Sequence, residues 1–262
     1  MAMLQLNDQL LYLTRSEWDD SGAPRLGVPV PVTDHTEAWM HHTVGSDSDA
    51  TPNQWGGLAD CKRRMRFLRT VRPDLGEDIP YTWVGFLMER QWQGEGGLVV
   101  CEGRGPGRRG AHTKYHNRTG VALALDGNFE DYAIDLTPWI PQLSRFWSWA
   151  KYEVPIPNLA TVTPHDADVW GHQQSGASTA CPGMFIMSKL PQVTIEEADM
   201  ISRDAKLFHT WGPAKLWCID YIAGVPMWRR WIKTQAGASV LTAALGEPEN
   251  TTLAQLATIP EL

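Results

Sequence analysis

Several features are missing from this chain of 262 residues, and each absence argues against a class of protein. No run of about 18 or more apolar residues occurs, so no segment is expected to insert into a membrane. The glycine-rich loop Gly103 to Gly110 is not followed by Lys-Ser or Lys-Thr, which argues against nucleotide binding. Acidic residues outnumber basic ones by 30 to 23, and the net charge of -7 argues against nucleic acid as the main partner.

Cysteine is also scarce, and the chain has no CxxC pair of the kind that builds structural zinc sites. The first nine residues are polar and have neither the basic nor the apolar segment of a secretory signal peptide. We therefore expect reduced thiols rather than a disulfide framework. The four cysteines are widely spaced, at Cys61, Cys101, Cys181 and Cys218.

Two histidine-bearing segments and one late cysteine are present, and together they could hold a metal. His41-His42, His172 and Cys181 offer imidazole and thiolate ligands, and three protein ligands leave the fourth position of a zinc ion for water. Spacing alone does not distinguish such a site from buried packing residues. Side chains alternate along a strand, so His41 and His42 cannot both face one ion, and the residues alone leave that choice open.

A series of short motifs resembles the peptidoglycan recognition protein and type-2 zinc amidase family, including the amidase domains of phage endolysins. Each motif is weak alone, but all occur in family order over roughly residues 10 to 190. The resemblance implies an α/β fold with a central, mostly mixed β-sheet flanked by helices. The motifs are Leu13 to Trp18, His41 to Thr43, Ile79 to Tyr81, Cys101 to Gly105, Ala111 to Thr113, Gly127 to Phe129, and Gly171-His172 with Cys181 to Gly183.

The resemblance also implies a set of functional residues. Family ligands of a zinc ion match His41, His172 and Cys181. Eight residues separate His172 from Cys181 where the family commonly has seven, so His165 stays open as an alternative to His172. The remaining matches are Tyr81, which would orient the water or stabilise the oxyanion, Thr179 on the oxyanion side, and the substrate-binding positions His112, Asn117 and Arg104.

The activity implied by the resemblance is hydrolysis of the amide bond between N-acetylmuramic acid and L-alanine in bacterial peptidoglycan. We predict a zinc amidase of the phage endolysin kind, made in the host cytoplasm without a signal peptide and acting on the cell wall after release. The alternatives are a non-catalytic peptidoglycan receptor of the same fold and a zinc hydrolase that recycles muropeptides. Receptors of the family typically lack the zinc cysteine, so Cys181 favours the enzyme. Neither stem-peptide specificity nor oligomeric state is indicated.

Local patterns predict the elements of this fold. Residues 1 to 35 suggest an extended arm, Val169 to Met184 a loop, and Thr137 the N-cap of a tryptophan-rich helix that ends near Tyr152. Strands are predicted over Glu37 to Val44, Tyr81 to Met88, Leu98 to Cys101 and Val121 to Leu125. A helix carries Leu58, Cys61, Met65 and Leu68 on one face. We interpret its other face as solvated, with contact to wall phosphates as the alternative; that face carries Lys62, Arg63, Arg64, Arg66, Arg69 and Arg72.

Residues beyond about 193 fall outside the resemblance. We predict a zinc amidase domain with its wrapping arm over 1–192 and a small α+β accessory module over 193–262. The module should open with a short helix at Thr194, continue with strands over Lys206 to Ile222 and Val225 to Lys233, and include a helix over Ala236 to Leu245. Its tryptophans either bind the cell wall or form the module's core; they are Trp211, Trp217, Trp228 and Trp231, from a total of 13.

Overall fold

A computed structural model describes residues 4–7, 9–43, 55, 57–88, 97–131, 133–154, 156–163 and 167–196, and four strands between 206 and 251. The chain divides into two compact units, Met1–Glu196 and Glu197–Leu262. This boundary lies four residues beyond the predicted one (196 against 192). The reason is that Val193 and Ile195 are buried in the core of the first unit, while the Thr194 amide donates to Ser144 Oγ at 3.0 Å.

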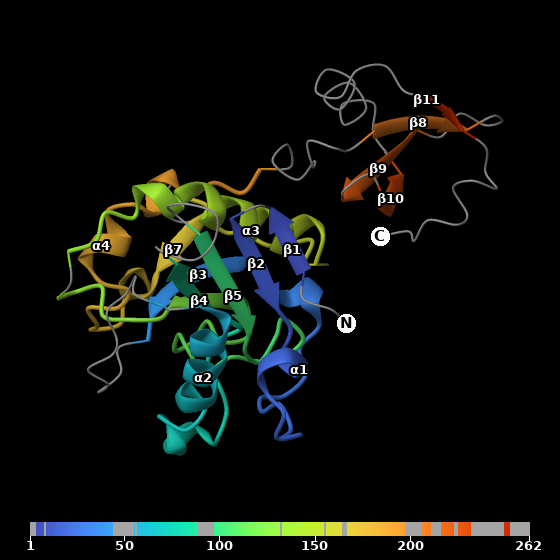
Figure 1. Ribbon diagram of the computed structural model, residues 1–262. Helices are drawn as coiled ribbons and strands as arrows, with labels where there is room; N and C mark the ends of the chain where they lie inside the picture. The colour runs from blue at the N-terminus through green and yellow to red at the C-terminus, as the bar shows by residue number, and fades with distance from the viewer. Residues whose placement is uncertain are drawn as a thin grey trace. The chain divides into compact units, whose positions relative to one another are not determined.

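A mixed sheet of seven strands forms the centre of the first unit, in the order β1-β2-β5-β4-β6-β3-β7 (Figure 1). The β1–β2 and β4–β5 pairs are antiparallel and the other pairs are parallel. β3, β4 and β6 are buried along their whole length, as strands covered on both faces must be. The predicted α/β class with a mixed sheet is confirmed. The strands are β1 (Leu4–Asn7), β2 (Leu10–Leu13), β3 (Glu37–His42), β4 (Trp83–Met88), β5 (Gly97–Glu102), β6 (Gly120–Leu125) and β7 (Val169–Gly171).

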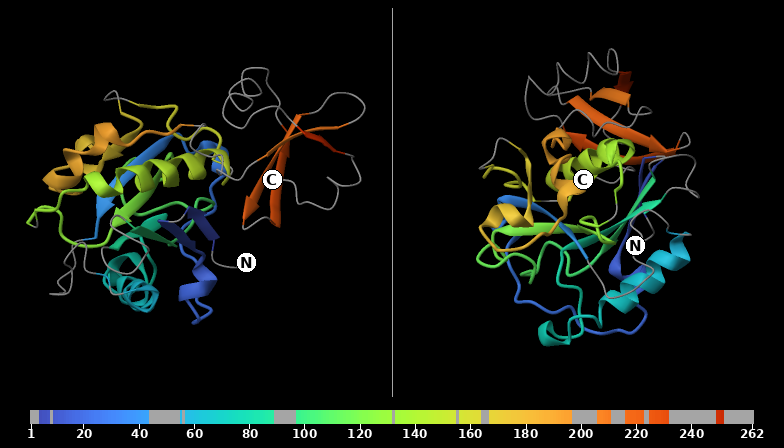
Figure 2. Two further views of the ribbon diagram at one scale, coloured as in Figure 1. Left: turned by 45° about the horizontal axis from the view of Figure 1, so that its top comes forward. Right: turned by 90° about the vertical axis from the view of Figure 1, so that its left-hand side faces the viewer.

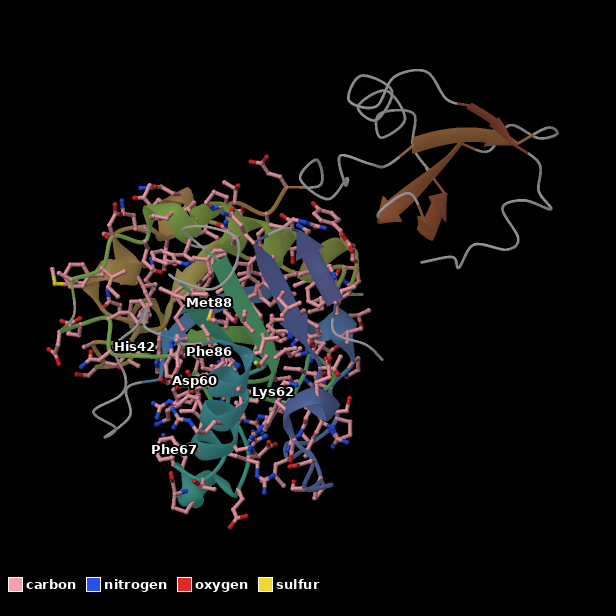
Figure 3. All side chains as sticks on the ribbon, in the orientation of Figure 1. His42, Asp60, Lys62, Phe67, Phe86 and Met88 are labelled. Carbon is pink, nitrogen blue, oxygen red and sulfur yellow. The ribbon has the colours of Figure 1, made fainter. Side chains whose placement is uncertain are left out.

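Helices cover the two faces of this sheet (Figures 1 and 2). Helix α2 (Leu58–Leu68) buries Cys61, Met65 and Leu68 in one cluster with Phe86 and Met88 of β4, which are labelled above the helix in Figure 3. Helix α3 (Ile140–Tyr152) packs on the opposite face in a second cluster. There the ring of Trp83 on β4 lies 5.1 Å from Phe146 and 5.9 Å from Trp147, centroid to centroid. The apolar residues at helical spacing therefore hold the sheet between two helical layers.

Short helical turns depart from the sequence expectations. The arm contains β1, β2 and α1 (Arg15–Trp18), because Thr14 and Glu17 form a capping box that starts a helix too short to show periodicity. The predicted loop over Val169 to Met184 contains β7 and η4 (His172–Ser175). Thr137 is the first residue of η3 (Thr137–Trp139) rather than an N-cap, and residues 193–196 are not helical. The other short elements are η1 (Val32–Asp34), η2 (Pro73–Leu75), α4 (Met184–Met187) and η5 (Leu190–Gln192).

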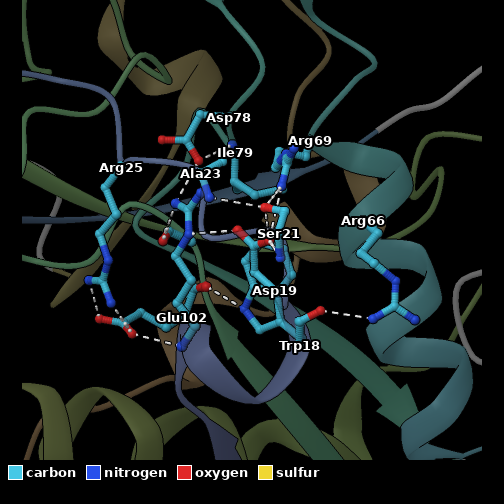
Figure 4. Close-up of polar contacts among 12 residues, drawn as sticks. Trp18, Asp19, Ser21, Ala23, Arg25, Arg66, Arg69, Asp78, Ile79 and Glu102 are labelled. Carbon is cyan, nitrogen blue, oxygen red and sulfur yellow. Dashed lines mark hydrogen bonds and ion pairs between the residues drawn. The ribbon is translucent and has the colours of Figure 1, made fainter.

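Ion pairs and hydrogen bonds fasten the N-terminal arm to the first unit (Figure 4). Arg25 binds both carboxylate oxygens of Glu102, at 2.7 and 2.8 Å. Arg15 Nη1 lies 2.7 Å from Asp78 Oδ1, and both side chains are buried. Trp18 Nε1 donates to the Glu102 carbonyl at 2.8 Å. A bidentate pair and a buried pair position a segment that has little secondary structure of its own.

One member of the predicted basic face is not at the surface. Arg64 is only 1% exposed, and its Nε donates to Asp126 Oδ2 at 2.8 Å. Asp126 also accepts a hydrogen bond from the Thr43 hydroxyl. The pair joins α2 to the ends of β6 and β3, next to His42. The prediction of a solvated face is therefore wrong at Arg64, because its partner lies 62 residues further along the chain.

The second unit contributes four described strands, in the order β10-β9-β8-β11. The predicted strand over Lys206 to Ile222 is two antiparallel strands, β8 (Lys206–Thr210) and β9 (Leu216–Ile222). β10 (Val225–Trp231) pairs with β9, and β11 (Glu249–Thr251) runs parallel to β8. The predicted helix over 236–245 lies outside the described residues. Among the described helices, none has the length and apolar character needed to cross a bilayer.

Candidate metal centre

The predicted zinc ligands meet at the carboxyl end of β3. β3 pairs in parallel with β7, in a register that places Met40 opposite Gly171. The next residues, His41 within β3 and His172 directly after β7, therefore lie side by side, and their ring centroids are 4.5 Å apart. Cys181 reaches the same place from the turn before α4, and its Sγ lies 3.4 Å from His41 Nδ1.

These three residues form a group that could hold a metal ion. Among the described residues it is the group in which three histidine, cysteine or carboxylate ligand atoms all lie within 4.8 Å of one another. Tetrahedral zinc with nitrogen and sulfur ligands places neighbouring ligand atoms about 3.5 Å apart. The separation of His41 Nδ1 from Cys181 Sγ already suits that geometry. Two imidazoles and a thiol therefore fit zinc and leave one coordination position open. His165, the alternative ligand, lies outside the described residues.

Backbone hydrogen bonds shape the turn that presents Cys181. The Gln173 amide donates to the Cys181 carbonyl at 2.8 Å, and the Cys181 amide donates to Thr179 Oγ1 at 3.2 Å. Gly176 ends η4 with φ of 80°, in the left-handed region that glycine enters without strain. Thr179 thus orients the cysteine from two residues away. Its predicted role on the oxyanion side of the site stays a prediction.

His42 has a different set of partners from His41. Its Nδ1 accepts a hydrogen bond from the Phe129 amide at 3.2 Å, and its own amide donates to Cys181 Sγ at 3.4 Å. A backbone N–H that points at sulfur stabilises a thiolate. His42 therefore supports the cysteine and the turn at Phe129, while His41 belongs to the ligand group.

Burial determines the protonation of the ligand group when no ion is bound. It lowers the pKa of His41 well below the ordinary value, and nearby His112 and His172 lower it further. Burial also lowers the pKa of His172. The pKa of the Cys181 thiol is raised by burial to about 12, against the opposing effect of the His42 amide. At neutral pH the imidazoles are therefore ready to bind a metal, whereas the thiol must first lose its proton.

Tyr81 lies beside the ligand group, just before β4. Its ring centroid is 5.3 Å from that of His41, and its hydroxyl donates to the His42 carbonyl at 3.4 Å. Burial raises the pKa of the phenol, and the nearby Cys181 raises it further. Tyr81 is consequently a neutral hydrogen-bond donor at neutral pH. Its participation in catalysis stays a prediction.

The segment between β5 and β6 contacts the Nε2 side of the His41 ring, opposite the side that faces Cys181. The Thr113 hydroxyl is 3.0 Å from His41 Nε2 and 3.0 Å from His112 Nδ1. Asn117 Oδ1 accepts hydrogen bonds from the amides of His112, at 2.7 Å, and Thr113, at 2.9 Å. The sequence alone did not indicate a role for Thr113, because its partner His41 is 72 residues away. Its position next to His112, a predicted substrate-binding residue, was the one feature that could have pointed to it. Substrate contact by His112 and Asn117 stays a prediction.

The described side-chain contacts of Arg104 are with Arg109 and Asp78 rather than with the ligand group. It is 4% exposed, its Nη1 donates to the Arg109 carbonyl at 3.2 Å, and its Nε lies 3.6 Å from Asp78 Oδ2. Burial lowers the pKa of its guanidinium, and Asp78 opposes that effect. These contacts shape the Gly103 to Gly110 loop. Substrate binding by Arg104 stays a prediction, and the contacts just described do not favour it.

Comparison with known proteins supplies relatives by sequence. The chain is 31% identical over 119 residues to peptidoglycan-recognition protein SA of Drosophila melanogaster. The match covers 45% of this chain and 50% of the relative, so it spans about half the length of that protein. No family model matches the chain.

Comparison with solved structures shows the fold. Wild-type Drosophila PGRP-LB superimposes with a TM-score of 0.50 at 20% identity, over 71% of this chain and 97% of that one. The ectodomain complex of PGRP-LCa and PGRP-LCx with tracheal cytotoxin matches with a TM-score of 0.50 at 23% identity, over 71% and 99%. The resemblance of the sequence motifs to peptidoglycan recognition proteins is thereby confirmed, and the likeness to phage endolysins stays a prediction.

Proposed function

Because the chain has the fold of the peptidoglycan recognition protein and type-2 amidase family, we propose that it is a zinc-dependent N-acetylmuramoyl-L-alanine amidase. It would hydrolyse the amide bond between N-acetylmuramic acid and L-alanine in bacterial peptidoglycan. The observation that carries this proposal is the convergence of His41, His172 and Cys181 at one edge of the sheet. A receptor that only binds peptidoglycan has no need of three converging metal ligands.

The residues around the ligand group suit amide hydrolysis. Zinc, when bound, would supply a water of lowered pKa and polarise the amide carbonyl. Tyr81 keeps its phenolic proton because burial raises its pKa, so it can donate a hydrogen bond to the oxygen on which negative charge develops. The His42 amide holds Cys181 Sγ, and Thr179 holds the Cys181 backbone. The chain thus fixes the ligand Cys181 through both its sulfur and its backbone, and it places a neutral hydrogen-bond donor, the Tyr81 hydroxyl, near the ligand group.

Digestion of purified peptidoglycan tests this function. The products are separated and identified by mass spectrometry, which distinguishes amide cleavage from cleavage between sugars or within the stem peptide. Wild-type protein should release stem peptides with a free L-alanine amino terminus. Cys181→Ser should release none. Cys61→Ser is the matched control, because Cys61 is buried between α2 and the sheet and should leave cleavage intact. Binding to peptidoglycan without any released peptide would favour the receptor.

We further propose that the protein is an endolysin, made in the cytoplasm of a host cell and acting on the wall after release, with the second unit adding affinity for the wall. When one unit is bound to the wall, the unit linked to it is held at a high effective concentration near its own target. A chain truncated after Glu196 retains Val193 and Ile195, which complete the core of the first unit. It should cleave small soluble muropeptides as the full chain does and lose activity on intact walls. Equal activity on both substrates would contradict wall binding, and insoluble protein would show that the second unit supports the first.

A further inference from the structure

We propose that Thr113 and His112 form a hydrogen-bonded relay that fixes the ring of His41 for metal binding. The inference rests on the proposed zinc site. It is carried by one hydroxyl placed between two buried imidazoles, 3.0 Å from His41 Nε2 and 3.0 Å from His112 Nδ1. All three side chains are buried, and Thr113 is fully so. The Thr113 hydroxyl has a single proton to share between the two ring nitrogens, so the direction of the two hydrogen bonds can be worked out.

The direction follows from the nitrogen that His41 turns to the metal group. Its Nδ1 faces Cys181 Sγ, so Nδ1 must carry a lone pair for the metal and Nε2 must carry the proton. That N–H donates to Thr113 Oγ1. The Thr113 hydroxyl is then free to donate its own proton to His112 Nδ1. His112 accepts it through the Nδ1 lone pair, which places the proton of its neutral imidazole on Nε2. Each member thereby selects the tautomer of the next.

Asn117 and Gly110 fix the position of the residues at the outer end of the relay. Asn117 Oδ1 accepts from the amides of both His112 and Thr113, so one side chain clamps the two residues that form the relay. Gly110 packs against the His112 ring so closely that an added Cβ would lie 2.2 Å from His112 Cδ2. The ring therefore has little freedom to turn away from Thr113. A metal-bound imidazole whose second nitrogen is held in this way is oriented before the ion arrives.

The relay gives His112 a positioning role through its Nδ1, which is engaged by Thr113. Its Nε2 is buried and has no hydrogen-bond partner among the described residues. The carbonyl oxygen of Asn117 accepts from two amides and so positions both His112 and Thr113. Through the relay, both residues act on the reaction by way of His41.

Zinc affinity, measured by competition with a chromophoric chelator on the full-length protein, tests the relay without depending on activity. Thr113→Val keeps the shape of the side chain and removes the hydroxyl, whereas Thr113→Ser keeps the hydroxyl. The valine variant should bind zinc about 10- to 100-fold more weakly, the usual cost of losing a partner behind a metal ligand. The serine variant should stay within about threefold of wild type. Thr82→Val is the matched control, because Thr82 is equally buried and its hydroxyl accepts from the Ala122 amide at 3.0 Å.

A second pair of variants tests the far end of the relay. His112→Leu removes the acceptor and should weaken zinc binding as Thr113→Val does, while His112→Asn keeps a polar atom near the position of Nδ1 and should recover part of the affinity. The double variant of His112→Leu with Thr113→Val should bind zinc little more weakly than either single variant, because both substitutions break the same hydrogen-bonded relay. Wild-type affinity in Thr113→Val, with zinc lost from Cys181→Ser, would overturn the relay and leave the zinc site standing. Failure of the wild type to bind zinc would overturn both.

Discussion

Both ends of β3 place histidine beside aromatic rings, but the hydrogen bonding at the two ends differs. At the amino end, His116 Nδ1 lies 3.0 Å from Glu37 Oε2, and Trp39 Nε1 donates to the same oxygen at 3.0 Å. The His116 ring rests 4.9 Å from that of Trp39, centroid to centroid. At the carboxyl end, the ligand group that converges among the described residues is His41, His172 and Cys181, none of which is a carboxylate.

This difference separates a structural cluster from a functional one. At the amino end the donors meet an acceptor, so the group is complete without a ligand. At the carboxyl end, neutral imidazoles bring lone pairs to within reach of a thiol, and a cation would satisfy them. A histidine near another polar side chain is therefore weak support for a metal site. Convergence of several lone-pair donors on one point, with no carboxylate to neutralise a charge, is much stronger.

The largest effect should come from removing one converging ligand. Cys181→Ser replaces a thiolate ligand with a hydroxyl that binds zinc poorly, so the content should fall from about one zinc per chain to almost none. The loss of affinity should exceed about 100-fold, the upper range for losing a residue that only supports a ligand. Elemental analysis and chelator competition measure both quantities. Full zinc content in Cys181→Ser would place the metal elsewhere, and activity of the wild type after exhaustive chelation would remove zinc from the reaction.

The next largest effect concerns Tyr81. Tyr81→Phe removes one hydrogen-bond donor from the carboxyl-end cluster, and turnover should fall by about 10- to 1,000-fold, as for a donor to a developing oxyanion. Zinc content and melting temperature should hardly change, since the ring contact with His41 is retained. Rates on soluble muropeptides, compared with those of the wild type, give the measurement. Unchanged turnover would leave Tyr81 as a packing residue.

A smaller effect is expected from pH. Burial raises the pKa of the Cys181 thiol to about 12, so the metal-free protein carries that proton at neutral pH and must release it on binding zinc. Burial lowers the pKa of His41 and His172, so neither imidazole holds a proton there. Apparent zinc affinity should therefore rise about tenfold per pH unit between about pH 7 and 9. Calorimetry in buffers of different ionisation enthalpy should detect one released proton per zinc. No release would mean that the thiol is already ionised.

Much of this arrangement could be predicted from the sequence, because it depends on short-range order. The buried strands and the apolar face of α2 each show their pattern within a few residues. Each motif is also short, and the order of the motifs along the chain led to the mixed sheet through the family resemblance. Arg64 and Thr113 show what such patterns miss. Their partners, Asp126 and His41, are 62 and 72 residues away, and only the paired strands bring them together. For the same reason, Arg64 was predicted to be a surface charge and Thr113 was given no role.

The smallest effect should come from the amino end of β3. Glu37→Gln removes the charge opposite His116 but keeps an oxygen that can accept from Trp39 Nε1. The loss of stability should be about 1 kcal/mol or less, because the His116 side chain is 26% exposed and water screens the pair. Glu37→Leu removes the acceptor altogether and should cost more, about 1 to 3 kcal/mol, by leaving the indole N–H unsatisfied. Chemical denaturation measures both, and zinc affinity should equal that of the wild type in each. A fall in zinc affinity in Glu37→Gln would show that the two ends of β3 are coupled, and the distinction between a structural and a functional end would then be wrong.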